Sequence, residues 1–316
     1  MLDPSDIYDV DPDVAARLDE RAAAGHRPVL VHAVRGFVDA GAAGRLAAEH
    51  LLDELEPTRL ASFDADQLID YRSRRPTMTF DATTWTSYEE PELVVDVLED
   101  GVGTPFLLLH GQEPDVQWER YVAAVRQLVE RFDVSLTVGV HGIPMGIPHT
   151  RPASVTAHAT RAELVADHPS WFGTVQVPAS ASALLELRLG QSGHDAMGFA
   201  VHVPHYLTQS SYPQASIAGL RAVERATGLD LRSHALDAAA SEATAEIERQ
   251  VEESQEISTV VHALEEQYDA FARSSERGSL LARSADLPTA DELGAEFERF
   301  LAEQGDEGRG EEGRGD

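Results

Sequence analysis

Short apolar runs alternate with amphipathic segments up to about residue 232, and this alternation limits the possible fold more than any other feature of the chain. The runs have the length of buried strands, and the segments between them have the apolar spacing of helices. This order predicts a mainly parallel sheet covered by helices on both faces. The expected strands are 28–34, 58–63, 105–110, 134–140, 154–158, 173–177 and 197–203, and the expected helices are 13–24, 40–55, 116–132, 179–189 and 213–227.

Three further segments are less regular. Met78–Phe80 and Glu92–Leu98 are interpreted as two strands of a hairpin. Residues 141–152 read HGIPMGIPHTRP, and their Pro and Gly content predicts an irregular loop. From His234 to Arg273 apolar residues recur at intervals of three and four, which predicts one or two long helices.

The predicted organisation therefore has four parts. Residues 1–232 form an α/β/α domain, and 233–273 form a helical segment that packs on this domain or lies at a partner interface. Residues 274–304 are expected to be a linker and a short helix. Residues 305–316 contain no apolar side chain and are expected to be a disordered acidic tail.

Composition excludes several kinds of chemistry. The 316 residues include 55 acidic and 25 basic residues, every basic one an arginine, and no cysteine. The absence of lysine excludes Schiff-base catalysis and a GK[ST] phosphate loop, and the absence of cysteine excludes disulfides and thiolate sites. A formal charge of -30 disfavours nucleic acid and anionic membranes as partners. With neither an apolar run long enough to span a membrane nor a targeting signal, we expect a cytoplasmic protein.

Two candidate sites follow the expected strands 28–34 and 105–110. Loop 36–44 opens a helix, where the backbone of Gly36 and Gly41 could hold an anion, although Asp39 would oppose it and could instead cap the helix. In HGQEPD at 110–115, Glu113 and Asp115 could act as acid and base or bind a ribose hydroxyl, or could stabilise the following helix through its dipole.

Two more candidate sites follow later strands. The loop 141–152 carries His141, His149 and Arg151, and Arg151 could pair with a carboxylate or a phosphate. After the last strand come His205 and Tyr206. Because the carboxyl ends of parallel strands meet at one edge, a ligand would be bound there. None of these histidines has the spacing of a metal motif such as HExxH, so no metal and no cofactor is expected.

These loops resemble those of a known family. GFVDAG at 36–41, HGQEPD with Trp118, HGIPMGIPHTRP at 141–152, and HVPHYL at 202–207 followed by YPQA at 212–215 look like the actinobacterial branch of the proteasome assembly chaperone two family, over residues 5 to 270. The resemblance implies a three-layer α/β/α sandwich similar to nucleoside phosphorylases and nucleosidases, with a C-terminal helical segment. It also implies homo-oligomers and protein partners related to the proteasome.

The sequence departs from relatives of that family in two respects. The chain ends Gly313-Arg-Gly-Asp316, whereas chaperone relatives dock through a hydrophobic–Tyr–any-residue tail. For a phosphorylase phosphate site only Arg35 and Arg151 are candidates. Two hypotheses remain open: a non-enzymatic assembly or scaffold protein with no established reaction, and a nucleoside-binding protein or nucleosidase-like hydrolase that uses the loops at the strand ends.

Overall fold

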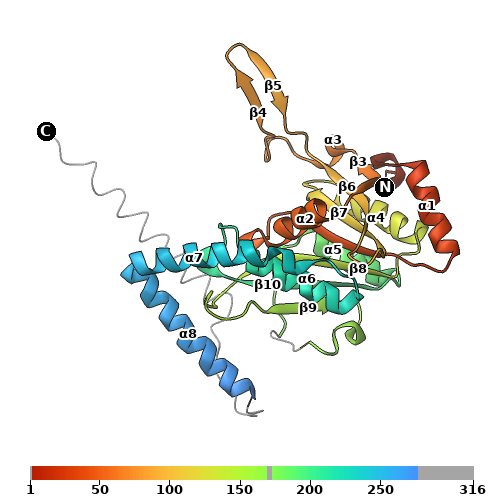
Figure 1. Ribbon diagram of the computed structural model, residues 1–316. Coiled ribbons are helices and arrows are strands. Elements are labelled where there is room, and N and C mark those ends of the chain that lie inside the picture. The colour runs from red at the N-terminus through yellow and green to blue at the C-terminus, as the bar shows by residue number, and fades with distance from the viewer. Residues whose placement is uncertain (1, 169–172, 277–316) are drawn as a thin grey trace. The chain divides into compact units, whose positions relative to one another are not determined.

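The computed structural model describes residues 2–168 and 173–276 (Figure 1). Its contacts divide the chain into one compact unit, Met1–Glu265, and a second unit, Glu266–Asp316. The boundary predicted at residue 232 lies within the first unit. Residues 274–276 belong to a helix, and the short helix and the tail predicted at 290–304 and 305–316 lie outside the described residues.

An eight-stranded sheet, with the order β1-β3-β6-β7-β2-β8-β10-β9, forms the centre of the first unit in the part of the chain that is described. Four neighbouring strands, β7, β2, β8 and β10, are parallel, and the strands that flank them pair antiparallel. Five of the eight strands point in the same direction, because β3 is antiparallel to β6, which is antiparallel to β7. The strand bounds are β1 Tyr8–Val10, β2 Val29–Arg35, β3 Thr58–Phe63, β6 Leu93–Glu99, β7 Pro105–Gln112, β8 Leu136–Met145, β9 Val155–Ala159 and β10 Ala196–Pro204.

Helices cover both faces of this sheet, which confirms the predicted three-layer α/β/α arrangement (Figure 1). One core lies between the sheet and α1, α4 and α5, and the other lies between the sheet and α2, α6 and α7. Because both faces are buried, the parallel strands carry continuous apolar runs such as Phe106–Leu109. The helix bounds are α1 Pro12–Ala23, α2 Ala43–Glu54, α3 Ala65–Leu68, α4 Trp118–Arg131, α5 Ala181–Gln191, α6 Pro213–Thr227, α7 Asp237–Glu253 and α8 Gln255–Glu276.

Local signals explain where these helices begin and end. The Asp11 side chain accepts hydrogen bonds from two backbone amides at the start of α1. In α4, buried Tyr121, Val125 and Leu128 recur every three or four residues and face the core. Helix α6 begins at Pro213 and ends before Gly228, whose φ of 77° suits glycine. Short 3₁₀ turns lie at Pro4–Ile7, Ala40–Ala42, Ala162–Val165, His205–Leu207 and Ser233–Leu236.

The structure corrects four details of the predicted elements. Strand β8 continues to Met145 instead of ending before the Pro-rich loop, because its last residues pair with β10. Segment 173–177 is not a strand, and its Val175 and Val177 side chains are exposed. Segment 92–98 lies in the main sheet as β6, between β3 and β7. The hairpin partner of β4 (Met78–Asp81) is instead β5 (Thr84–Tyr88).

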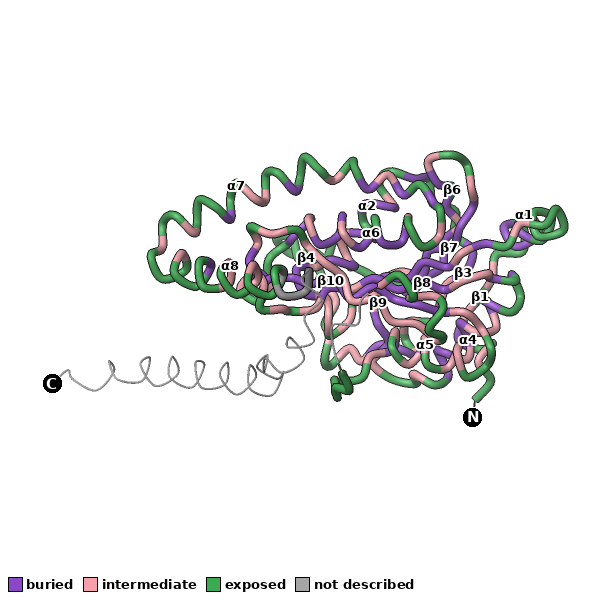
Figure 2. The backbone as a smooth tube through the Cα atoms, turned by 90° about the horizontal axis from the view of Figure 1, so that it is seen from below, coloured by how far each residue is buried: buried purple, intermediate pink, exposed green. Residues whose placement is uncertain are grey.

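The helical segment after residue 236 contributes to the second core. Ile247 on α7 is buried there, and Val251 packs against the same cluster. The outer side of α7 is exposed along most of its length (Figure 2). No helix in residues 2–168 or 173–276 is both long enough and apolar enough to span a bilayer.

Candidate functional site

The parallel strands β2, β7, β8 and β10 end at one edge of the sheet, and the ten candidate residues lie on or beside the segments that leave this edge. Whether they form a site depends on what each side chain contacts. The candidates do not share one set of contacts. Several of them instead bond to the backbone of a neighbouring segment.

Glu113 is the most buried of the candidate side chains that carry a charge, at 3% exposure. Its Oε2 accepts a hydrogen bond from the Phe37 amide at 3.1 Å, and its Oε1 accepts one from the Ala181 amide at 2.7 Å. Gly36 leaves room for this carboxylate, since a Cβ there would lie 2.3 Å from Oε2. The Ala181 amide opens α5, so the helix dipole also favours the negative charge.

Asp39 occupies the amides that an anion would need. Its carboxylate accepts hydrogen bonds from Gly44 at 2.8 Å and Arg45 at 3.0 Å, at the start of α2, and from Gly142 on β8 at 3.0 Å. Burial raises the pKa of this carboxyl, and the three amides oppose that shift. Asp39 therefore caps the helix, one of the two alternatives that the sequence left open.

Gly41 and Asp115 are also engaged with backbone. Gly41 has a φ of 65°, donates its N–H to the Thr208 carbonyl and accepts from the Tyr212 amide, which joins the loops after β2 and β10. Asp115 accepts a hydrogen bond from the Asp70 amide at 2.9 Å and pairs with Arg74 at 2.8 Å. Glu113 and Asp115 therefore bind different segments and do not act as an acid–base pair in this arrangement.

His149 and Tyr206 are the candidates that the structure brings into hydrogen-bond contact. The Tyr206 hydroxyl accepts from the His149 amide at 2.9 Å and lies 2.7 Å from the ring Nδ1, to which it donates. The His205 ring is 5.4 Å from the Tyr206 ring. Burial lowers the pKa of His149 and raises that of Tyr206, so both are neutral near pH 7.

Arg151 and His141 lie in other surroundings. Arg151 is within 3.4 Å of Glu265 on α8, which also accepts a hydrogen bond from the Thr150 hydroxyl at 2.5 Å. His141 lies on β8, with its ring 6.1 Å from that of His158 on β9. Burial lowers the pKa of His141 to about 4.

A cluster of polar side chains around His141 was not recognised from the sequence. His158 donates to Glu186 on α5 at 2.8 Å, and the ring of His32 on β2 packs against Gly139. Each histidine is isolated in its own strand, so their proximity depends on strand order, which no local pattern reveals. Among the residues described, no group of three or more His, Asp or Glu could hold a metal ion.

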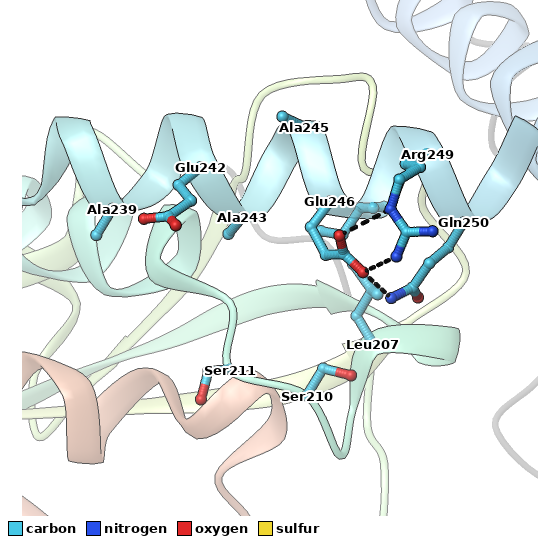
Figure 3. A pocket seen from close by; sticks show the side chains of 11 residues that line it. Leu207, Ser210, Ser211, Ala239, Glu242, Ala243, Ala245, Glu246, Arg249 and Gln250 are labelled. Carbon is cyan, nitrogen blue, oxygen red and sulfur yellow. Dashed lines mark hydrogen bonds and ion pairs between the residues drawn. The ribbon is translucent and has the colours of Figure 1, made fainter.

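Among the described residues, the candidate side chains do not meet in one concave site. Gly36 joins Glu113, and His149 joins Tyr206 and His205, but Asp39, Asp115, His141 and Arg151 each bond elsewhere. A groove with a volume of ≈ 690 Å³ lies instead between α7 and the segment after β10 (Figure 3). Its lining includes none of the ten candidates.

Comparison with solved structures finds several similar folds. A Mycobacterium tuberculosis protein of unknown function is 48% identical, with a TM-score of 0.80 over 87% of this chain and 92% of that one. A Corynebacterium glutamicum protein of unknown function is 39% identical, with a TM-score of 0.77 over 84% and 97%. A M. tuberculosis proteasome-assembly chaperone homologue is 24% identical, with a TM-score of 0.68 over 74% and 99%, and thus shares the fold.

Comparison of the sequence identifies the family. No significant match to a curated protein is found. The model of the PAC2 family matches residues 33–251, which include all ten candidate residues and most residues of the two buried cores. The match covers more than half of the chain, and the chain therefore belongs to the PAC2 family.

Proposed function

We propose that this chain is a non-enzymatic, chaperone-like assembly protein whose partners are proteins, proteasome subunits among them. Membership of the PAC2 family supports this proposal. So does the likeness to a fold neighbour that is itself described as a proteasome-assembly chaperone homologue. The chain has a formal charge of -30, so a partner that presents basic patches would be favoured.

The main support for the proposal is that the acidic side chains at the carboxyl edge of the sheet are hydrogen-bonded to backbone amides. Both carboxylate oxygens of Glu113 accept backbone amides, and Asp39 accepts three. A catalytic acid or base must reach a substrate proton, and a ligand needs free donors. Groups that are already satisfied by backbone fix the loops in place instead.

The helical segment supplies a surface for a protein partner. On α8, Val261 is buried, whereas Ile257 and Val260 are 40% and 41% exposed. Glu256 and Glu253 lie beside them in the sequence and are exposed. Two neighbouring branched aliphatic side chains with acidic flanks fit a partner surface that is apolar at its centre and basic at its rim.

Purified proteasome subunits of the source organism provide the test. We expect the chain to bind free α subunits and to raise the rate at which native gels show complete particles. A variant with Ile257→Asp and Val260→Asp should lose both effects, whereas Leu187→Asp, an exposed apolar residue on α5, should retain them. Absence of binding together with an unchanged assembly rate would refute the proposed function.

The nucleosidase-like alternative has an equally direct test. A ligand that binds only the folded state must raise the temperature of unfolding. A thermal-shift screen against nucleosides, nucleotides and sugar phosphates should therefore give no shift. A saturable shift that is lost in a Tyr206→Phe variant would favour a small-molecule site at the His149–Tyr206 pair instead.

A further inference from the structure

Strand β9 ends the strand order of the eight-stranded sheet and pairs with β10 alone among the described strands (Figure 1). At the two ends of this antiparallel pairing, His202 donates its N–H to the Ser154 carbonyl and Thr160 donates its N–H to the Ala196 carbonyl, both at 2.9 Å. Residues that exchange hydrogen bonds across an antiparallel pair alternate with residues whose backbone groups are directed away from the partner strand. The even-numbered residues of 154–160 therefore face β10, and the odd-numbered ones face away from the sheet.

Val155, Ala157 and Ala159 consequently present their N–H and C=O groups along the outer side of β9. None of these groups forms a hydrogen bond within residues 2–168 and 173–276. All three residues are partly exposed, and β9 contains no charged Asp, Glu or Arg, no proline and no bulge, the features that protect many edge strands. The opposite edge of the sheet differs, since β1 has three residues with the exposed Asp9 at its centre. Strand β9 is thus the edge on which another strand can pair.

A groove with a volume of ≈ 360 Å³ lies beside the first residues of β9, between Val155 and helix α6. Ile217 and Ala218 on α6 contribute apolar side chains to its wall. Arg221 and Arg225 also line the groove, and because they are four residues apart they lie on the same side of the helix. The open edge of β9 therefore has two guanidinium groups next to it.

These two arginines have only one acidic partner. Arg221 lies 3.3 Å from Asp237, which also lines the groove. Arg225 is exposed and forms no ion pair in the part of the chain that is described. In a chain with a formal charge of -30, this leaves a local excess of positive charge, which attracts a carboxylate.

A strand that paired with β9 would place every second side chain on the side of this groove. Val155, Ala157 and Ala159 pack against the core on the α6 side of the sheet. Residues opposite each other on neighbouring strands point to the same face, so the residues opposite these three would point to the α6 side as well. Carboxylates at alternate positions of the added strand would therefore lie on the face that carries Arg225.

We propose that β9 is a docking edge for an extended acidic segment of a partner protein, which adds a further strand to the sheet and places its carboxylates at Arg221 and Arg225. The backbone hydrogen bonds would supply affinity, and the arginines would select acids at every second position. The apolar patch at Ile257 and Val260 suits a partner with a basic rim, whereas this edge suits an acidic one. The proposal therefore does not depend on the proposed proteasome partner.

Fluorescence anisotropy with a labelled peptide of sequence TEVEVEVT, which carries its acids on one face of a strand, tests the charge. The full chain should bind this peptide saturably and more weakly at high salt, and should not bind TKVKVKVT. Arg225→Glu replaces an attraction by a repulsion and should weaken binding at least about fivefold. Arg17→Glu, at an exposed arginine of α1 that has no ion pair among the described residues, changes the net charge equally and should bind like the unmodified chain. Equal affinities of the two variants, or no binding of the acidic peptide, would overturn the proposal.

Backbone pairing has a separate readout in hydrogen exchange. The acidic peptide at saturation should slow exchange of the Ala157 and Ala159 amides at least about tenfold, because these amides have no partner in the free chain. The Thr156 and His158 amides face β10 and should change little. Unchanged exchange at Ala157 and Ala159 in the complex would show that the peptide is held by charge alone, which would overturn strand addition.

Two N-methylated peptides complete the test on the unmodified chain. One is methylated at the amides of its three glutamates and the other at those of its three valines. Only one of the two sets faces β9 in a paired strand, so one peptide should lose binding and the other should retain it. Loss of both or of neither would refute the pairing. Protection of Ala157 and Ala159 without peptide would also overturn the proposal: a dependence on protein concentration would assign the edge to a second copy, and loss on deletion of residues 277–316 would assign it to that segment.

Discussion

Glu113 and Ala181 are 68 positions apart, and the carboxylate of the first accepts the backbone amide of the second at 2.7 Å. The same carboxylate accepts the Phe37 amide. One side chain thus connects the segment after β2, the segment after β7 and the start of α5. The sequence suggests Glu113 as a catalytic acid or base, but each of its carboxylate oxygens accepts a hydrogen bond from a backbone amide.

Replacing Glu113 by Gln should destabilise the fold. The amide group is isosteric, but its NH₂ must face a backbone N–H, which leaves a buried donor unsatisfied and costs about 2 kcal/mol. Urea unfolding would measure this loss as a lower midpoint with an unchanged slope. Glu163→Gln, on an exposed 3₁₀ turn, is the control and should change the free energy of unfolding by less than about 0.5 kcal/mol. Equal stability of the two variants would contradict the structural role.

Replacing Gly142 by Ala should be more damaging still. A Cβ on Gly142 would lie 2.0 Å from the Ala40 carbonyl oxygen, and since this atom is backbone, β8 or the turn before α2 must shift. Overpacking of this kind typically costs 1–3 kcal/mol, so we expect a loss of about 3 kcal/mol. Gly173→Ala has open space at its Cβ and serves as the control. A Gly142→Ala variant that unfolds at the same urea concentration as the control would contradict the close approach.

Much of the fold could be predicted because its central strands are buried on both faces. Runs such as Phe106–Leu109 are apolar throughout, and this pattern can be recognised without knowing which strands lie beside them. Strand β6 was harder to recognise because Asp96 interrupts its apolar run. Only the structure reveals that Asp96 is bonded to Arg59 and His110. The continuation of β8 through Pro144 depends on pairing with β10, which local composition does not report.

The candidate residues were predictable by position but not by contact. The sequence correctly indicates that Asp39 and Glu113 follow the ends of β2 and β7. It cannot show that Gly142 and Ala181 supply their amides, because these partners come from distant segments. The hairpin had a local signal, since Met78, Phe80, Trp85 and Tyr88 flank a short polar turn, but that turn was not recognised.

His32 should make stability depend on pH. Burial lowers its pKa to about 4, and the neighbouring histidines His141 and His158 act in the same direction, while Glu186 opposes them. The unfolded chain therefore binds a proton near pH 6.5 that the folded chain binds only near pH 4, so stability is lost as the pH falls through this window. The contribution of His32 amounts to about 3 kcal/mol across it.

A variant that cannot titrate isolates this effect from the many carboxylates. Urea unfolding from pH 4 to 7.5 should show that His32→Gln loses less stability on acidification than the unmodified chain. His234→Gln, at an exposed position, should follow the unmodified chain. Parallel pH profiles for the His32 variant and the unmodified chain would show that His32 is not the buried neutral group that the structure indicates.

Glu265 should hold the first half of α8 on the loop after β8. Its carboxylate accepts the Thr150 hydroxyl and lies near Arg151, and the Thr150 hydrogen bond is the main reason that its pKa is lowered. A lowered pKa in the folded state means that this contact stabilises the protein above the ordinary pKa of glutamate and is lost as the pH falls. Glu265→Gln should remove this pH dependence and should raise the hydrogen-exchange rate of amides in residues 255–265. Because the side chain is partly exposed, the loss should be at most about 1 kcal/mol.

Glu256→Gln changes an exposed glutamate on the same helix and should leave both measurements unaltered. If exchange in residues 255–265 is equally fast in the unmodified chain and the Glu265 variant, α8 is not held by this contact.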